Sequence, residues 1–230
     1  MEQLAKTLSI VVAIALFVAG PTSAHSLKDV EELLGSKEQF FQAIDKEAPS
    51  FTLQDADGKI VSSSDLRGKY LVVNFIYTGC PDVCPLHAEK IAEIQEMVND
   101  TPMKGLVEFV TITTDPTHDS GAVLRDYGSA HGLDPVNWTF LTTTPGQAED
   151  TTRQLAESFG HKFKKTDDGY QLHGIVTHVV DRDGRWRGNF HGLRFNKTNF
   201  VVFLNALTNA QVPHSHHEPG LWSRISAWFH

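Results

Sequence analysis

The stretch Tyr70-Leu-Val-Val-Asn-Phe-Ile-Tyr77 runs directly into Thr-Gly-Cys-Pro-Asp-Val-Cys-Pro85, and these two halves predict different structures. The first half is nearly all apolar, which is typical of a central β-strand covered on both faces. The second half ends on Pro85, a residue that suits the first turn of a helix. Apolar residues then recur at helical spacing, at Leu86, Ile91, Ile94 and Val98. We therefore predict a buried strand, a turn that carries both cysteines, and a helix with an apolar stripe.

On either side of this stretch, predicted strands alternate with predicted helices. Strands are expected at residues 51–53, 60–61, 107–114 and 138–141, and helices at residues 120–130, 147–159 and 196–210. The turn Asp181-Arg-Asp-Gly184 separates two further strand-like segments and is a hairpin signal. This order predicts an α/β fold, in which a mixed central sheet has helices on both faces and a β-hairpin after the last crossover.

The N-terminal segment predicts export. Residues 1–24 combine Lys6 with an apolar run at residues 8–20, which is shorter than the roughly 20 residues needed to span a bilayer. Small residues at Thr22-Ser-Ala24 suit a signal peptidase, so we expect a cleaved signal peptide and a location in the bacterial periplasm. An uncleaved anchor is the alternative, and it would hold the chain at the outer face of the inner membrane. Residues 25–46 are expected to form a helical lead-in.

The charge balance is acidic. The 230-residue chain has 20 Lys and Arg against 28 Asp and Glu, a net charge of −8. The predicted leader removes one residue of each sign, Lys6 and Glu2, so the mature balance of 19 minus 27 is also −8. A nucleic-acid partner is not expected, because binding phosphates requires a basic surface. An acidic surface suits a cationic partner or a metal ion.

The only two cysteines, Cys80 and Cys84, lie in one short segment. A structural disulfide is the ordinary interpretation in an exported protein. It is weak here because closing so short a loop removes little entropy from the unfolded chain. A helix N-terminus favours the thiolate form, and this spacing puts the two sulfurs about one helical turn apart. The pair can therefore share one metal ion or cycle between dithiol and disulfide.

The ligand count favours copper among the metals. Soft thiolates select Cu(I), zinc or iron–sulfur clusters, and imidazole extends the choice to Cu(II). Two cysteines cannot supply an iron–sulfur cluster with its cysteine ligands within one chain. A structural zinc site would need two further histidines to close a shell of four. Copper can be held by three ligands.

The segment Phe75-Ile-Tyr-Thr-Gly-Cys-Pro-Asp-Val-Cys-Pro85 closely resembles the signature of the Sco (SenC-like) family of copper proteins. Further similar segments are Ala48-Pro-Ser-Phe-Thr-Leu53, Gly58, Leu66-Arg-Gly-Lys69, Thr113-Thr-Asp-Pro116 and Asp119. The resemblance covers about residues 47–208 and leaves out both ends of the chain. It implies a thioredoxin-like fold, which we assign to a domain at residues 47–211.

The resemblance also implies a ligand set and a role. Members of the family bind copper through the two motif cysteines and one histidine, eight residues before the aspartate of an Asp-x-x-Gly turn. Counting back from Asp181 gives His173, although the family's usual Asp-His-Ser is Leu172-His173-Gly174 here. The implied cargo is one copper ion, Cu(I) or Cu(II), on Cys80, Cys84 and His173.

The implied role is assembly of the binuclear copper site of cytochrome c oxidase, with the copper-site subunit of that enzyme as partner. Other periplasmic copper carriers or thiol reductants are further expected partners. The alternative function is that of a thiol–disulfide oxidoreductase, which would reduce cysteines of an exported partner.

Four other side chains of the domain are weighed against plainer roles. Asp82 and Asp115 are candidates to support the ligands from outside the metal shell, with turn formation or helix capping as the alternative. His178 is a rival ligand, but it is five residues from His173 along a predicted strand, and an odd separation points the two side chains to opposite faces. His87 is expected to be an ordinary exposed histidine near a helix start.

Residues 212–230 are predicted to be a separate element. His214, His216 and His217 either capture metal or form a solvated histidine tract. The segment that follows carries apolar residues with Arg224 on one possible amphipathic helix: Leu221, Trp222, Ile225, Trp228 and Phe229. Such a helix suits a membrane surface, and docking on the domain is the alternative.

Deletion of residues 221–230 tests the membrane assignment. If this helix lies on the membrane, the truncated protein moves from the membrane fraction to the soluble fraction of lysed cells, because its apolar face no longer binds lipid. Unchanged fractionation would contradict the assignment.

Overall fold

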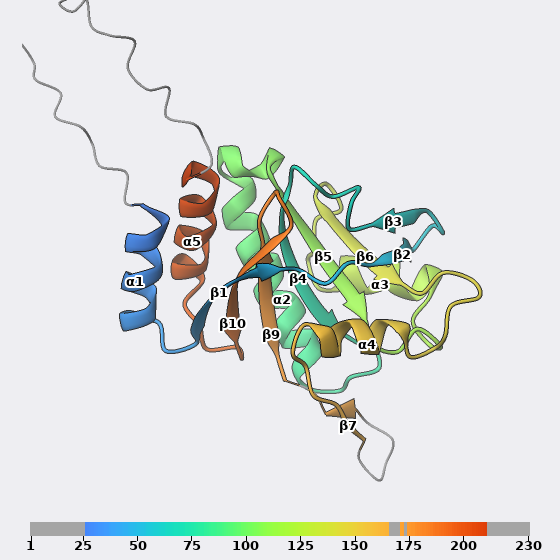
Figure 1. Cartoon of the computed structure of the whole chain (residues 1–230). Coiled ribbons are helices and arrows are strands. Elements are labelled where there is room, and N and C mark those ends of the chain that lie inside the picture. Colours follow the sequence, from blue (N-terminus) through green and yellow to red (C-terminus); the bar gives the residue numbers. More distant parts are fainter. Residues whose placement is uncertain (1–25, 166–170, 173, 211–230) are drawn as a thin grey trace, which may run out of the picture.

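The computed structural model describes residues 26–165, 171–172 and 174–210, and its centre is a mixed eight-stranded sheet (Figure 1). The strand order is β1-β10-β9-β4-β5-β6-β2-β3. The strands are β1 Phe41–Glu47, β2 Thr52–Asp55, β3 Ile60–Ser62, β4 Tyr70–Ile76, β5 Val107–Thr113, β6 Trp138–Thr142, β9 Val176–Val180 and β10 Arg185–His191. A separate ribbon pairs β7 Lys164–Lys165 with β8 Gln171–Leu172.

The helices cover both faces of this sheet. They are α1 Leu27–Lys37, α2 Val83–Asn99, the 3₁₀ helix η1 Pro102–Gly105, α3 Gly121–Ala130, α4 Thr151–Ser158 and α5 Lys197–Ala210. One buried cluster joins α1, α2, α3 and α5 to the sheet, and a second joins α4 to it. Within the described residues, none of these helices is both long and apolar enough to cross a membrane. The prediction of an α/β fold with helices on both faces is confirmed.

Strand β4 lies at the centre of the sheet, and all seven of its residues are buried. It runs parallel to β5 and antiparallel to β9, with Asn74 opposite Thr111 on one side and Thr177 on the other. The start of β9 therefore lies at the same edge of the sheet as the ends of β4 and β5. The turn with the cysteines leaves β4 at this edge.

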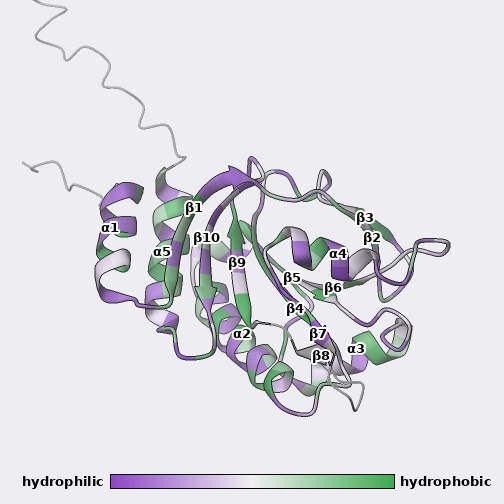
Figure 2. Cartoon of the chain, turned by 60° about the horizontal axis from the view of Figure 1, so that its bottom comes forward, coloured by the Kyte–Doolittle hydropathy of each residue, from purple (hydrophilic) through white to green (hydrophobic). Residues whose placement is uncertain are grey.

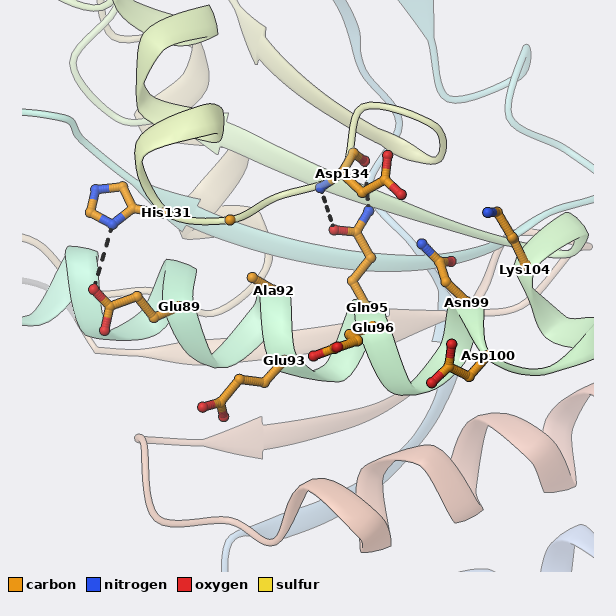
Figure 3. A pocket seen from close by; sticks show the side chains of 11 residues that line it. Glu89, Ala92, Glu93, Gln95, Glu96, Asn99, Asp100, Lys104, His131 and Asp134 are labelled. Atoms are coloured by element: carbon orange, nitrogen blue, oxygen red, sulfur yellow. Dashed lines mark hydrogen bonds and ion pairs between the residues drawn. The ribbon is translucent and has the colours of Figure 1, made fainter.

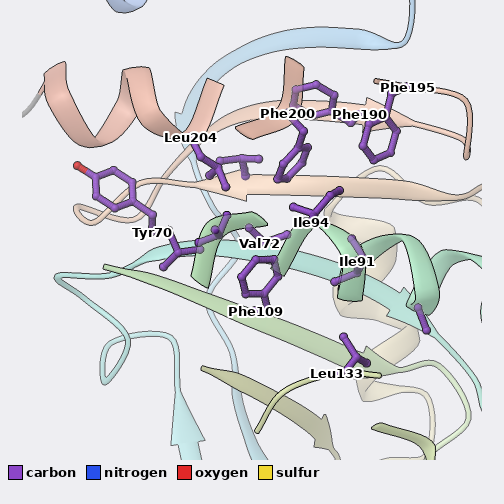
Figure 4. Close-up of a cluster of buried hydrophobic side chains, with 14 of the residues drawn as sticks. Tyr70, Val72, Ile91, Ile94, Phe109, Leu133, Phe190, Phe195, Phe200 and Leu204 are labelled. Atoms are coloured by element: carbon purple, nitrogen blue, oxygen red, sulfur yellow. The ribbon is translucent and has the colours of Figure 1, made fainter. Parts of the chain in front are cut away.

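Helix α2 packs its apolar stripe on β4 and β5. Ile91 and Ile94 lie against Val72 and Phe109 in one cluster (Figure 4). The stripe also contains Cys84, His87, Ala88, Gln95 and Val98. The prediction that Leu86 belongs to this stripe is wrong, since its side chain is 50% exposed. The prediction that His87 is exposed is wrong too, because it is buried. Both errors have one cause: the buried face starts at Cys84 and returns three and four residues later, which excludes Leu86.

The predicted helical lead-in at residues 25–46 is only half correct. Helix α1 begins with a capping box between Ser26 and Asp29 and ends at Lys37. Residues Phe41–Glu47 then form the edge strand β1, which pairs antiparallel with β10. The Phe41 ring packs 5.0 Å from that of Phe190 and 4.9 Å from that of Phe203, between ring centroids. Because of this long-range pairing, residues 41–47 form a strand, although the sequence predicts a helix up to residue 46. The predicted leader and tail lie outside the described residues.

Helix α4 is shorter than predicted, whereas the hairpin agrees with its prediction. The helix expected at residues 147–159 spans Thr151–Ser158. Helix α4 has hydrophobic and hydrophilic residues on different sides, so its colour alternates along the ribbon (Figure 2). The predicted hairpin is confirmed in β9 and β10. The Asp181 carboxylate accepts hydrogen bonds from the backbone N–H groups of Asp183 at 3.0 Å and Arg185 at 2.9 Å, and Gly184 adopts φ 80°.

A pair of glycine substitutions tests how tightly α3 packs on the sheet. A Cβ at Gly128 would lie 2.2 Å from the Trp138 ring, so Gly128→Ala should lower the free energy of unfolding by about 1–3 kcal/mol. The control is Gly35→Ala in α1, where a Cβ meets nothing within 4 Å and helix propensity predicts a gain of about 0.5–1 kcal/mol. Denaturant unfolding measures both. Equal effects of the two substitutions would contradict this packing.

Candidate metal and thiol site

The two thiols lie at the junction between β4 and α2. Strand β4 ends at Ile76, and α2 begins at Val83. Cys80 belongs to the connecting turn, where its backbone N–H donates to the Tyr77 carbonyl at 3.2 Å, and Cys84 lies in the first turn of α2. Both are free thiols, with Cys80 8% exposed and Cys84 3% exposed.

The pKa values of the two thiols move in opposite directions. Burial acts to raise the pKa of Cys80, but a hydrogen bond with Cys84 and backbone N–H groups of residues 82–84 hold it below its ordinary value. Burial, followed by the hydrogen bond with Cys80, raises the pKa of Cys84 well above its ordinary value. Cys80 is therefore the thiol that ionises first.

The rim of the site faces solvent. Gly79, Pro81 and Asp82 are exposed, and Leu86 projects from α2 one turn away. Asp82 occupies the N-cap position of α2, but its side chain makes no capping hydrogen bond. A partner can therefore approach the thiols from this edge of the sheet.

A buried aspartate holds the turn from inside. Asp119, which is 0% exposed, accepts hydrogen bonds from the Thr78 backbone N–H at 2.9 Å, the Thr78 hydroxyl, and the Thr113 hydroxyl at 2.6 Å. Asp115, the residue predicted for a supporting role, instead accepts a hydrogen bond from the exposed His118 at 2.9 Å. Sequence analysis named Asp119 only as part of the family pattern and gave it no role at the thiols, because its burial cannot be seen in the local sequence.

Tyr127 brings a third polar group close to the thiols. The residue is buried in the cluster that contains Cys80 and Cys84, and its hydroxyl has no hydrogen-bond partner among the described residues. Burial, and then the negative charges of Cys84 and Cys80, raise its pKa. A buried hydroxyl without a partner is costly, and its unused donor fits a site whose sulfurs carry negative charge.

The predicted histidine ligand lies outside the described residues. His173 immediately precedes Gly174, in the segment that leads into β9. Strand β9 begins at the edge of the sheet where β4 ends and where the cysteine turn leaves it. Within residues 26–165, 171–172 and 174–210, no three His, Cys, Asp or Glu side chains are grouped to hold a metal ion.

His178 belongs to a buried network, and its ring packs 4.9 Å from the Phe159 ring, between centroids. Its Nδ1 lies 2.7 Å from Asn189 Oδ1, which also accepts from Trp186 Nε1 at 2.8 Å, so Nδ1 of His178 carries the proton. Its Nε2 then accepts from His161 Nε2 at 2.9 Å. Burial lowers the pKa of His178 well below its ordinary value. His178 is thus a packed neutral histidine; sequence analysis missed its partner His161.

A separate polar groove runs along the far part of α2 (Figure 3). It has a volume of about 710 Å³ and is lined on one side by α2 from Glu89 onwards and by its C-cap Asp100, and on the other by His131, Gly132 and Asp134. His131 Nδ1 lies 3.8 Å from the Glu89 carboxylate across its end. Neither cysteine lines this groove.

Solved structures of Sco proteins superpose on this fold. A SCO1/SenC family lipoprotein from Bacillus anthracis superposes with a TM-score of 0.66 at 24% identity, over 73% of this chain and 98% of its own. Bradyrhizobium japonicum ScoI, solved with copper bound, superposes with a TM-score of 0.57 at 29% identity, over 70% of this chain and 99% of its own. In sequence, an SCO2-like protein from Rickettsia conorii is 28% identical over 186 residues, 79% of this chain and 87% of the relative.

Fold and site together define a thioredoxin-like protein with a reduced dithiol at the start of a helix. The sequence model of the SCO1/SenC family matches residues 37–204, and the chain belongs to that family. The match begins ten residues before the domain boundary predicted at residue 47, and so it includes the edge strand β1.

Alkylation tests the opposite pKa shifts. Cys80 should react with iodoacetamide at lower pH than Cys84, because the thiolate is the nucleophile and Cys80 has the lowered pKa. Cys84→Ala should raise the pKa of Cys80, since a hydrogen bond to its thiolate is lost. Cys80→Ala should lower the pKa of Cys84, which loses both the hydrogen bond and the neighbouring charge. Mass spectrometry of each site against pH measures the order, and Cys84 reacting first would contradict it.

Proposed function

We propose that this protein carries one copper ion on Cys80, Cys84 and His173, and passes it to the copper-site subunit of cytochrome c oxidase. The single observation that carries the proposal is the pair of free thiols, hydrogen-bonded to each other at the N-terminus of α2. Membership of the SCO1/SenC family supports it, as does the copper bound to B. japonicum ScoI.

The chemistry of the donor set fits copper in both oxidation states. Two thiolates suit the soft Cu(I) ion, and an imidazole adds a donor that suits Cu(II). Both thiols must lose their protons to bind, so binding releases protons and tightens as the pH rises. The raised pKa of Cys84 makes its proton the harder one to displace. Tyr127 would then donate to negative charge at the sulfurs.

The exposed rim supports transfer to a protein partner. An ion held at a surface edge can exchange between ligand sets without unfolding of the core. Gly79 and Pro81 leave the approach to Cys80 open, and the exposed Leu86 offers an apolar contact beside it. Export to the periplasm would place this edge on the side of the membrane where such a subunit presents its copper site. Metal capture by His214, His216 and His217 would supply the same ion.

The asymmetric thiols favour a second candidate, a thiol–disulfide oxidoreductase. The Cys80 thiolate would attack a partner disulfide, form a mixed disulfide and release one partner thiolate. Cys84, after losing its proton, would attack the Cys80 sulfur and release the second partner thiolate. Two electrons pass to the partner, and a thiol reductant must restore the dithiol. A protein that delivers copper to a dithiol site can use both activities.

Copper titration of the reduced full chain tests the first function. We expect about one tightly bound copper ion, loss of Cu(I) binding in Cys80→Ser and Cys84→Ser, and Cu(II) affinity at least about tenfold weaker in His173→Ala. His191→Ala is the control, since His191 lies on β10 and its Nε2 is 3.2 Å from Gln42 Oε1. Equal Cu(II) affinities of the His173 and His191 variants would contradict the ligand assignment.

The same variants separate the two functions. Reductase activity needs the cysteines but not the imidazole. Reduction of a disulfide substrate that survives in His173→Ala and is lost in Cys80→Ser, together with no copper binding by the wild type, would favour the reductase alone.

A further inference from the structure

Asp119 is a buried carboxylate without a basic partner. It makes no ion pair among the described residues, and its side chain is bonded to Thr78 and Thr113 alone. Burying a charge is costly unless it is paired or fully hydrogen-bonded. An apolar residue of similar volume is often as stable in such a position, so packing alone does not explain a carboxylate here.

The directions of these hydrogen bonds identify Asp119 as an acceptor. The Thr78 backbone N–H can only donate. Thr113 Oγ1 accepts from the Asp115 backbone N–H at 2.9 Å, so the proton of the Thr113 hydroxyl is free to point at Asp119. The two carboxylate oxygens thus receive donors from both the cysteine turn and the end of β5.

The backbone of Asp119 is fixed independently of its side chain. Its N–H donates to the Asp115 carbonyl at 2.9 Å, and its carbonyl accepts from the Thr142 hydroxyl on β6 at 3.1 Å. The backbone that carries this carboxylate is therefore hydrogen-bonded to Asp115, just after β5, and to Thr142 at the end of β6.

Thr78 links Asp119 to Cys80. It is two residues before Cys80, and the Cys80 backbone N–H closes the turn on the carbonyl of Tyr77. On the side before the turn, the Thr114 backbone N–H donates to the Ile76 carbonyl at 2.7 Å. Between that bond and the start of α2, Asp119 holds the turn by two hydrogen bonds, from the backbone N–H and the hydroxyl of Thr78.

We infer that Asp119 is a positioning residue, which acts through Thr78 to hold Cys80 in the geometry that binds copper. This inference rests on the proposed function, because it assigns a second residue to the same site. Groups that orient a ligand from outside the metal shell commonly change metal affinity or activity by 10–100-fold when they are lost.

Substitutions on either side of the carboxylate test the inference. Thr78→Val removes the hydroxyl and keeps the shape of the side chain. Thr78→Ser keeps the hydroxyl and removes only the methyl group. Asp119→Asn replaces the carboxylate by a neutral amide. The matched control is Thr142→Val, which removes a hydrogen bond to the backbone of Asp119 and leaves its carboxylate in place. The readouts are the thiolate-to-Cu(II) charge-transfer band, the rate of copper release to a chelator, and the free energy of unfolding.

We expect Thr78→Val and Asp119→Asn to alter the charge-transfer band and to release copper at least about tenfold faster. Thr78→Ser should resemble the wild type, and Thr142→Val should lose stability while its band and release rate stay unchanged. Wild-type bands and release rates in both Thr78→Val and Asp119→Asn would overturn the inference. If Asp119→Asn does not fold, Thr78→Val against Thr78→Ser decides it.

A copper-free readout keeps this test separate from that of the proposed function. The reduction potential of the Cys80–Cys84 pair, measured at equilibrium with oxidised and reduced dithiothreitol, should shift in Thr78→Val and not in Thr142→Val. Wild-type protein that binds no copper would refute the proposed function alone, while the shift in potential would still support the role of Asp119. Equal potentials in all variants would refute that role.

Discussion

The structure depends on the burial of β4 between two layers of helices. Every residue of this strand is buried, and it pairs with β5 on one side and with β9 on the other. The strand can leave the core only at its end, and there the chain must turn before α2 can cover the sheet. The cysteines occupy that turn and the first helical turn after it. The antiparallel neighbour β9 begins at the same edge, and His173 precedes this strand by three residues in the sequence.

This position sets two opposing effects on the thiols. Burial disfavours the thiolate, whereas the N-terminus of a helix and its unpaired N–H groups favour it. The balance differs over a distance of four residues, because Cys80 receives the N–H groups directly and Cys84 lies deeper in the first turn. A pair in which one thiol has a lowered pKa and the other a raised pKa suits both a metal ion that must be released and a disulfide that must be reversible. The inner support from Asp119 belongs to the same design, since it fixes the turn without covering the thiols.

Much of this arrangement could be predicted from the sequence. The apolar run of β4, Pro85 at the start of α2 and the Asp181–Gly184 turn are local signals, and each produced the predicted element. The errors came from features that local patterns do not contain. Strand β1 exists because Phe41 meets Phe190 and Phe203, which are far away in the sequence. The rotation of α2, which exposes Leu86 and buries His87, is set by its contact with the sheet. Asp119 and the pair of His161 with His178 are recognisable only once burial and distance are known.

X-ray absorption spectroscopy at the copper edge of the copper-loaded full chain tests the central claim most directly. The account predicts two sulfur donors and one imidazole for each copper ion, and loss of the imidazole contribution in His173→Ala with both sulfurs retained. Copper surrounded by nitrogen and oxygen donors alone would contradict it, because the thiols of Cys80 and Cys84 would then not be the ligands.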